Sequence, residues 1–179
     1  MKTAMEMAKI RSFGTERLTL RLMNESDWEL FIDQVLIADD WYMTFGYEKC
    51  EELLMKVIKP CFNKAIYYSI FLPGTDEMVG FVGFSIDTHY IEYYIFKDYR
   101  RCGYAYEAVH EFINMLHYGK IMNMPVNTIQ AWTVWENTPS IELLFKLNFH
   151  SLGFRITDEG CAIQYFSYRP DYREALSAA

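Results

Sequence analysis

The sequence has no hydrophobic run long enough to cross a membrane. Its longest apolar stretch, residues 66–72, is far shorter than the roughly 18 to 20 residues that a membrane-spanning helix needs. Residues 1–12 carry charged side chains and lack the apolar core of a secretory signal. We therefore expect a cytoplasmic protein without a membrane partner.

Positive charge is in short supply, because 17 Lys and Arg stand against 24 Asp and Glu and the formal net charge is −7. A chain with this balance has no general attraction for the phosphate backbone of a nucleic acid. Nucleic acid is therefore not an expected partner, and any anionic ligand must be bound by a local site.

The cysteines and glycines do not form the spacings of common metal, redox or phosphate sites. No C-x-x-C pair is present, and we interpret the four cysteines as free thiols, mostly buried, with no metal. They are Cys50, Cys61, Cys102 and Cys161. The nine glycines form neither G-x-G-x-x-G nor G-x-x-x-x-G-K-[ST], which excludes Rossmann and P-loop sites.

Apolar and aromatic side chains are abundant: 51% of the 179 residues are hydrophobic and 17% are aromatic. A chain of this length has no room for two full cores, so one domain is expected over residues 1–179. We place its core at about residues 15–169 and expect residues 1–12 and 170–179 to be loosely attached tails.

Hydrophobic periodicity and turn residues predict a mixture of strands and helices. The strands are expected at residues 17–22, 66–72, 78–86, 90–96, 128–135, 149–157 and 162–169. Helices are expected around residues 28–35, 48–59 and 105–116, and a shorter one runs from a cap at residues 137–139 to residue 147. This order fits an α+β or α/β fold with helices on both faces of a sheet.

One segment joins a predicted strand directly to the start of an amphipathic helix. It consists of Arg100, Arg101, Cys102, Gly103, Tyr104 and Ala105. A helix start presents unpaired N–H groups and about half a positive charge, and both suit phosphate oxygens. Gly103 lets the backbone approach a ligand, Ala105 is small, and the arginines add charge. The segment therefore fits a pyrophosphate, with a tight turn bearing two solvated arginines as the alternative.

The pattern R-x-x-G-x-[GA] in this segment resembles the acetyl-CoA loop of the GNAT superfamily of N-acetyltransferases. Downstream, Asn137 and Ser140 followed by K-L-N-F at residues 146–149 are similar to the N-x-x-S and K-L-G-F motif of that superfamily. The segments T-E-R-L-T-L-R at residues 15–21 and Y-A-Y-E-A at residues 104–108 look like the branch that modifies the amino termini of ribosomal proteins.

The resemblance implies a GNAT fold, an α/β sandwich with a mixed central sheet of about seven strands between layers of helices. The fourth and fifth strands splay apart in that fold, and their free backbone groups bind the pantetheine arm and the thioester of acetyl-CoA. The residues implied on the fourth strand are Tyr94, Ile95 and Phe96. The segment from Arg100 to Ala105 would bind the pyrophosphate, and Asn137, Ser140 and Lys146 would complete the cofactor site, without a metal.

The implied activity is acetyl transfer from acetyl-CoA to a primary amine by direct attack in a ternary complex. The amine would belong to a protein N-terminus or to a small molecule. Many GNAT enzymes protonate the departing thiolate with a tyrosine, and this chain has Leu144 at that position. The resembling branch suggests that Ser140 donates a hydrogen bond to the sulfur and that Asn137 binds pantetheine or orients the helix. Helix capping alone is the alternative for both residues.

The base that accepts the amine proton has two candidates near the fourth strand, Glu92 and His89. An alternating strand points them to opposite faces, so at most one faces the amine, and we favour Glu92. A surface carboxylate without a catalytic role is the alternative.

An aromatic loop over residues 38–47 is the predicted binding site of the acceptor amine. It offers Trp41, Tyr42, Phe45 and Tyr47, with Asp39 or Asp40 to attract a cation. Core anchors and surface charges are the alternative interpretation of the same residues.

The missing tyrosine at position 144 and a displaced cation in the loop keep a rival hypothesis open, whereas a second departure from the family pattern, at Asn148, is mild. Arg101 and Cys102 stand where the branch has Gly-Lys, and Asn148 replaces a glycine, although Asn also tolerates a positive φ. The rival is a module that binds acyl-CoA without turnover, and a protein that binds another nucleotide is a third hypothesis. The sequence leaves a homodimer open.

Overall fold

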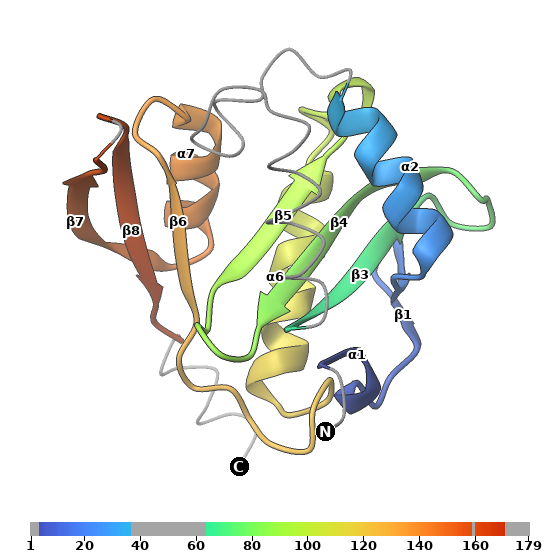
Figure 1. Ribbon diagram of the computed structural model, residues 1–179. Helices are drawn as coiled ribbons and strands as arrows, with labels where there is room; N and C mark the ends of the chain where they lie inside the picture. The colour runs from blue at the N-terminus through green and yellow to red at the C-terminus, as the bar shows by residue number, and fades with distance from the viewer. Residues whose placement is uncertain (1–3, 37–63, 159, 171–179) are drawn as a thin grey trace.

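The computed structural model describes residues 4–36, 64–158 and 160–170. Within these residues, eight strands form two antiparallel sheets with helices packed against them (Figure 1). The larger sheet has the strand order β1-β2-β3-β4-β5, and the smaller sheet has the order β6-β8-β7. The strands are β1 (Ser12–Gly14), β2 (Thr19–Leu22), β3 (Ala65–Phe71), β4 (Met78–Ser85), β5 (Ile91–Ile95), β6 (Gln130–Val134), β7 (Phe149–Ile156) and β8 (Ala162–Tyr168). The helices are α1 (Ala4–Met7), α2 (Glu25–Leu36), the 3-10 turn η2 (Lys97–Tyr99), α6 (Tyr104–His117) and α7 (Thr138–Lys146).

Helices cover both faces of the larger sheet, as the sequence predicted. Side chains of a strand alternate between faces, so neighbouring residues of β3 enter different cores. Tyr68 packs against Phe112 of α6, with ring centroids 5.7 Å apart. Its neighbour Tyr67 lies in a second core with Phe31 of α2. This two-sided burial fixes β4 and β5, which lead to the predicted cofactor segment.

The backbones of β5 and β6 meet at one end and then diverge (Figure 1). An isolated parallel bridge joins Tyr90 to Gln130, where the Gln130 N–H donates to the His89 carbonyl at 2.8 Å. No ladder between β5 and β6 follows this bridge in the described residues. The divergence lies between the fourth and fifth predicted strands, where the resemblance placed it.

Helix α7 begins and ends as the sequence predicted. The Asn137 side chain caps its first turn by accepting a hydrogen bond from the Ser140 N–H, and a proline follows in that turn. Asn148 lies just beyond the helix with a φ of 63°, the left-handed conformation that asparagine tolerates.

The amino-terminal segment differs from the expected loose tail. Residues 4–12 pack on the molecule: Ala4 and Ala8 are buried in the main core, and the Tyr68 hydroxyl donates to the Ile10 carbonyl at 2.6 Å. Strand β1 then adds an eighth strand that the sequence did not predict, because its three residues are too short for a period-two pattern. The sequence did not predict the burial of Ala4 and Ala8, because charged residues surround these two small side chains.

The predicted loop at residues 38–47, the predicted helix at residues 48–59 and the tail beyond residue 170 lie outside the described residues. In the part of the chain that the structure describes, no helix is long and apolar enough to cross a bilayer.

Candidate active site

The predicted phosphate segment is a loop built on two left-handed residues. Arg101 has a φ of 63° and Gly103 a φ of 82°, between the turn η2 and the start of α6. Gly103 is the residue that caps α6, and it has no side chain with which to occupy the first N–H groups of the helix. The start of α6 therefore presents its N–H groups and its positive dipole end to a ligand.

Side chains from the distant amino-terminal part of the chain hold this loop in place. The Arg17 guanidinium donates to the Glu107 carboxylate at 2.8 Å and to the Cys102 carbonyl at 2.9 Å. Thr15 donates to the same carboxylate at 2.5 Å. A Cβ atom on Gly103 would lie 3.2 Å from the Arg17 guanidinium and would be strained at a φ of 82°, so glycine suits this position.

These contacts also set the charge of Glu107. Partial burial alone would raise its pKa, but the hydrogen bonds from Thr15 and Arg17 outweigh burial and lower the pKa below its ordinary value. Arg17 and Glu107 were not among the predicted site residues. They lie within the two short motifs at residues 15–21 and 104–108 that carry the family resemblance, so a signal for them was present in the sequence.

The hydrogen-bond ladder decides which N–H groups of β5 face β6. The Phe96 N–H donates to the Val79 carbonyl of the β4 side at 2.9 Å. Because direction alternates along an antiparallel strand, the N–H of Tyr94 points to β4 as well, and that of Ile95 points toward β6. Of the three predicted donors, Tyr94, Ile95 and Phe96, only Ile95 therefore directs its N–H toward β6.

The two arginines of the loop have different positions. Arg100 donates from Nε to the Ile95 carbonyl at 2.9 Å, and its guanidinium lies 5.2 Å from the centre of the Tyr94 ring. It thus braces the end of β5. Arg101 is exposed at the tip of the loop, beside Cys102, which is also exposed.

Ser140 faces β5 across the divergence. Its Oγ lies 2.6 Å from the hydroxyl of Tyr93, and its N–H donates to the Asn137 side chain at 3.3 Å. Burial raises the pKa of Tyr93 to about 12, so this hydroxyl stays protonated at neutral pH. Sequence reasoning missed Tyr93, since no local pattern pairs it with a serine 47 positions away. Leu144, at the position of the usual tyrosine, is fully buried.

Glu92 lies on the other face of β5, toward α2. The Tyr67 hydroxyl donates to its carboxylate at 2.8 Å, across the strand β4. Gly83 of β4 stands between the two residues, and a Cβ atom there would lie only 2.2 Å from the Tyr67 ring. The absence of a side chain at Gly83 is therefore what lets the tyrosine reach the carboxylate.

Desolvation by surrounding protein atoms raises the pKa of Glu92, and the hydrogen bond from Tyr67 lowers it by less. The side chain is nevertheless accessible to solvent. Such a group is more basic than an ordinary glutamate and can still meet a substrate.

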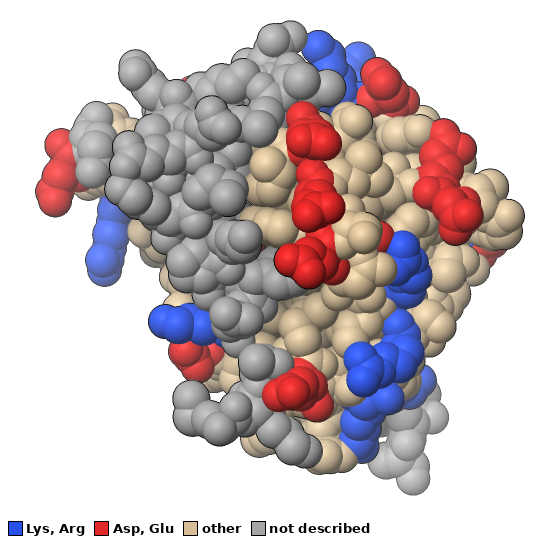
Figure 2. Space-filling view, turned by 45° about the vertical axis from the view of Figure 1, so that its right-hand side comes forward, with Lys and Arg blue, Asp and Glu red and all other residues tan. Residues whose placement is uncertain are grey.

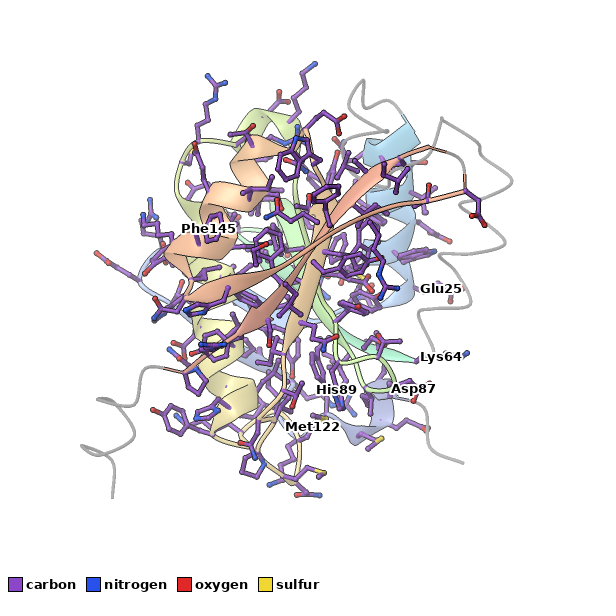
Figure 3. All side chains as sticks on the ribbon, turned by 90° about the vertical axis from the view of Figure 1, so that its left-hand side faces the viewer. Glu25, Lys64, Asp87, His89, Met122 and Phe145 are labelled. Atoms are coloured by element: carbon purple, nitrogen blue, oxygen red, sulfur yellow. The ribbon has the colours of Figure 1, made fainter. Side chains whose placement is uncertain are left out.

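His89, the other candidate base, is placed differently. It lies with Asp87 at the turn before β5 (Figure 3) and stacks on Phe84, with ring centroids 6.0 Å apart. Phe84 belongs to the core on the α6 side, opposite the face of Glu92. The two candidates thus point to different faces of the sheet, and only Glu92 faces α2.

Lys146 lies at the end of α7, with Nζ 4.4 Å from the centre of the Tyr106 ring of α6. A hollow beside it is lined by Tyr106, His110, Asn114, Asn148 and Tyr168. Lys146 therefore bridges α7 and α6 on the side of the sheet that also carries Tyr93 and Ser140.

The predicted acceptor residues Asp39, Trp41, Tyr42 and Phe45 lie outside the described residues, as do Cys50 and Cys61. Cys161 is buried, in line with its interpretation as a core thiol. Among residues 4–36, 64–158 and 160–170, no group of three His, Cys, Asp or Glu side chains is arranged to hold a metal ion.

Comparison with known proteins places this geometry among acetyltransferases. Residues 17–150 match the family described as Acetyltransferase (GNAT) domain. The chain is 37% identical to the uncharacterized N-acetyltransferase p20 of Bacillus licheniformis over 96 residues. These residues make up 51% of this chain and 52% of that protein. The chain thus spans about half the length of this curated relative.

Solved structures share the fold at low sequence identity. An acetyltransferase from Agrobacterium tumefaciens superposes with a TM-score of 0.72 at 18% identity, over 90% of this chain and 96% of that one. The ribosomal L7/L12 alpha-N-protein acetyltransferase RimL, in complex with coenzyme A, superposes with a TM-score of 0.64 at 18% identity, over 86% of this chain and 94% of that one.

Proposed function

Because this chain belongs to the GNAT acetyltransferase family, we propose that it transfers an acetyl group from acetyl-CoA to a primary amine. The observation that carries this proposal is the coincidence of two features at one end of β5. The strand has an edge without a ladder partner in β6, and it leads through the 100–105 loop to the start of α6, where no side chain caps the helix. The first feature suits an extended pantetheine arm and the second suits a pyrophosphate.

The pyrophosphate and the thioester of acetyl-CoA each have an assigned group in this proposal. The N–H groups at the start of α6 bind the pyrophosphate, with Arg101 as the nearby cation. The Ile95 N–H binds the thioester carbonyl and stabilises the oxyanion that forms on attack. Asn137 and Ser140 lie on the α7 side of the same edge, and Lys146 extends the site toward α6.

The amine attacks the thioester directly, from the side of the sheet that carries Glu92. Its nitrogen bonds to the acetyl carbon, the carbon–sulfur bond breaks, and Glu92 accepts the amine proton. The raised pKa of Glu92 supports this role, because a base works best when its pKa approaches the working pH. Glu92→Gln should flatten the acidic limb of the rate profile and lower kcat/KM by about 100-fold or more.

The acceptor class follows from amine basicity. At pH 7 about one in six α-amino groups is neutral, compared with about one in 2500 lysine side chains. A protein N-terminus is thus the easier substrate, and RimL, which shares the fold, is an α-N-protein acetyltransferase. Small-molecule amines are the second substrate class. A single domain, a cytoplasmic location and a homodimer stay predictions.

Exposed acidic residues on α2 support a cationic acceptor. Glu25, Glu29 and Asp33 are spaced four residues apart and lie on one stripe of the helix. Figure 2 shows a row of acidic side chains on the face that α2 presents. The field of this acidic stripe raises the local concentration of protonated amines on the Glu92 side of the sheet.

A thiol-release assay tests the proposed function. Purified protein is mixed with acetyl-CoA and with peptides of varied N-termini, polyamines or aminoglycosides, and free CoA thiol is measured over time. We expect acceptor-dependent thiol release, fastest with a peptide, and none from the same peptide with a blocked N-terminus. Tight CoA binding with no thiol release for any acceptor would favour the rival hypothesis of a non-catalytic module. That rival stays open because Leu144 stands where many GNAT enzymes have a tyrosine. CoA that fails to bind would favour another nucleotide.

A further inference from the structure

One hydrogen bond crosses from the larger sheet to α7 beside the divergence of β5 and β6. It joins the Tyr93 hydroxyl to Ser140 Oγ at 2.6 Å, a short distance for two hydroxyls. Tyr93 shares its side of the sheet with Ile91 and Ile95, which pack in the α6 core, because the side chains of β5 alternate. This is the side on which α6 and α7 lie.

The hydroxyl hydrogens of Tyr93 and Ser140 allow the pair to donate one hydrogen bond to a third group. Each hydroxyl carries one hydrogen, and one of the two hydrogens lies in the bond between the oxygens. Whichever group donates, the pair retains one O–H hydrogen that can be donated to a third group. The pair therefore acts as a single donor whose position is fixed from two sides, by β5 and by α7.

The environment of Ser140 favours a negative partner for that donor. Ser140 lies in the first turn of α7, where the helix dipole is positive and where Asn137 holds its N–H. The burial that keeps Tyr93 protonated means that the pair donates a hydrogen bond without losing its proton.

We propose that Tyr93 is a positioning residue that orients the Ser140 hydroxyl, so that the pair hydrogen-bonds the thiolate sulfur of the departing coenzyme A. This inference rests on the proposed acetyl transfer. The hydroxyl pair would stabilise the thiolate in place of the tyrosine that many GNAT enzymes have at the position of Leu144.

The atoms of the step balance without any further reagent. The amine nitrogen bonds to the acetyl carbon, the carbon–sulfur electron pair stays on sulfur, and Glu92 takes the amine proton. The hydroxyl pair stabilises the new charge on sulfur and keeps both of its protons. The thiolate leaves with that hydrogen bond and takes its proton from water after release.

An ultraviolet titration of bound coenzyme A tests the inference without turnover or an acceptor. The thiolate absorbs in the ultraviolet and the thiol does not, so a pH series with desulfo-CoA as the blank gives the apparent pKa of the bound thiol. In the wild-type protein we expect this thiol to be about tenfold more acidic than in free coenzyme A, a shift of about one pKa unit.

The variants separate positioning from a structural role. Ser140→Ala should abolish the shift, and Tyr93→Phe should reduce the thiol acidity by about threefold or more. The double variant should match Ser140→Ala, because the two residues act as one unit. Tyr93→His, which keeps a ring with a donor, should recover part of the shift. Tyr68→Phe is the matched control: it removes a tyrosine hydroxyl bonded to the Ile10 carbonyl and should leave the thiol unchanged.

Two results would overturn the inference and are distinguishable. If the wild-type protein does not bind coenzyme A, the proposed function fails and the inference falls with it. If coenzyme A binds but Tyr93→Phe titrates like the wild type while Ser140→Ala shifts, or if the two effects add, the positioning role is wrong and the proposed function stands.

Discussion

The two sheets of the molecule differ in how they are buried. Every residue of β3 in the larger sheet is buried, whereas only Phe149 of β7 in the smaller sheet is. Leu152, Phe154 and Ile156 of β7 are each more than 60% exposed. The larger sheet, covered by α2 and α6, is thus the rigid platform that carries Glu92, Tyr93 and the cofactor loop.

The smaller sheet shares the main core with this platform through Ala131, Phe149 and Phe166, and two polar contacts join the two sides beside the proposed site. The Tyr90–Gln130 bridge and the Tyr93–Ser140 hydrogen bond connect the two sides of the divergence. We infer that substitutions in the platform core act mainly on stability, whereas substitutions where the two sides meet act mainly on the chemistry.

The largest effect on stability is expected from Phe112→Ala. Phe112 is fully buried between α6 and the larger sheet, so its loss should lower the free energy of unfolding by about 3–5 kcal/mol. Urea unfolding measures the change. Phe154→Ala on β7 is the matched control, since the same ring is 61% exposed there and its loss should cost about 1 kcal/mol or less. Equal costs at the two positions would contradict the comparison.

The next largest effect is expected from Gly83→Ala, because the absence of a side chain at Gly83 lets Tyr67 reach Glu92. In Gly83→Ala the new Cβ atom would lie 2.2 Å from the Tyr67 ring, and we expect a cost of about 1–3 kcal/mol in unfolding free energy. The displaced tyrosine would no longer donate to Glu92. Because that hydrogen bond lowers the pKa of Glu92, its loss should move the acidic limb of kcat/KM to higher pH.

The control for this prediction is Gly14→Ala in β1 of the same sheet. A Cβ atom there meets its first neighbour at 3.8 Å, an ordinary contact, so neither stability nor the pH profile should change. An unchanged acidic limb in the Gly83→Ala protein would mean that the hydrogen bond from Tyr67 does not control the pKa of Glu92.

The bracing of the loop by Arg17 and Glu107 should have a smaller effect, because the pair is partly exposed. Glu107→Gln should lower stability by about 1 kcal/mol and weaken CoA binding a few-fold, as measured by denaturation and calorimetry. The folded pKa of Glu107 is lowered, so its contribution is present above the ordinary value of 4.5 and is lost as the pH falls through the folded value.

The stability difference between wild type and Glu107→Gln should therefore shrink in acid. Glu111→Gln, one turn later on α6, is the control and should change neither CoA binding nor the acid dependence. A difference that stays constant from pH 7 to pH 3 would mean that charge at Glu107 does not hold the loop.

The features that the sequence predicted are local ones. The strand–loop–helix segment around Gly103, the apolar stripe of α6 and the capping of α7 by Asn137 each follow from residues close together in the chain. The divergence of β5 and β6 was predicted only through the family resemblance, because backbone pairing between strands leaves no mark on composition.

The contacts that the sequence did not reveal join distant positions. Arg17 and Glu107 are 90 residues apart, Tyr93 and Ser140 are 47 apart, and Tyr67 and Glu92 are 25 apart. A single sequence does not pair such residues. The sequence also could not separate Ile95 from Tyr94 and Phe96 as a donor to the ligand, since which edge of β5 an N–H faces depends on the register with β4.

The smallest expected effect concerns the acidic stripe on α2. Neutralising Glu25, Glu29 and Asp33 together should raise KM for a cationic acceptor about two- to fivefold at low salt, and the difference should vanish at about 0.5 M salt. Stability should change little, because all three side chains are exposed. The control neutralises three exposed aspartates elsewhere, Asp76, Asp87 and Asp158. Equal KM values for the two triple variants would remove the electrostatic role of α2.

The most direct test of the central claim is a crystal structure of the protein with coenzyme A bound. We predict the pyrophosphate on the N–H groups at the start of α6, the pantetheine arm along the β6-facing edge of β5, and the sulfur within hydrogen-bond distance of Ser140. Coenzyme A bound elsewhere, with the 100–105 loop and the edge of β5 vacant, would contradict the account.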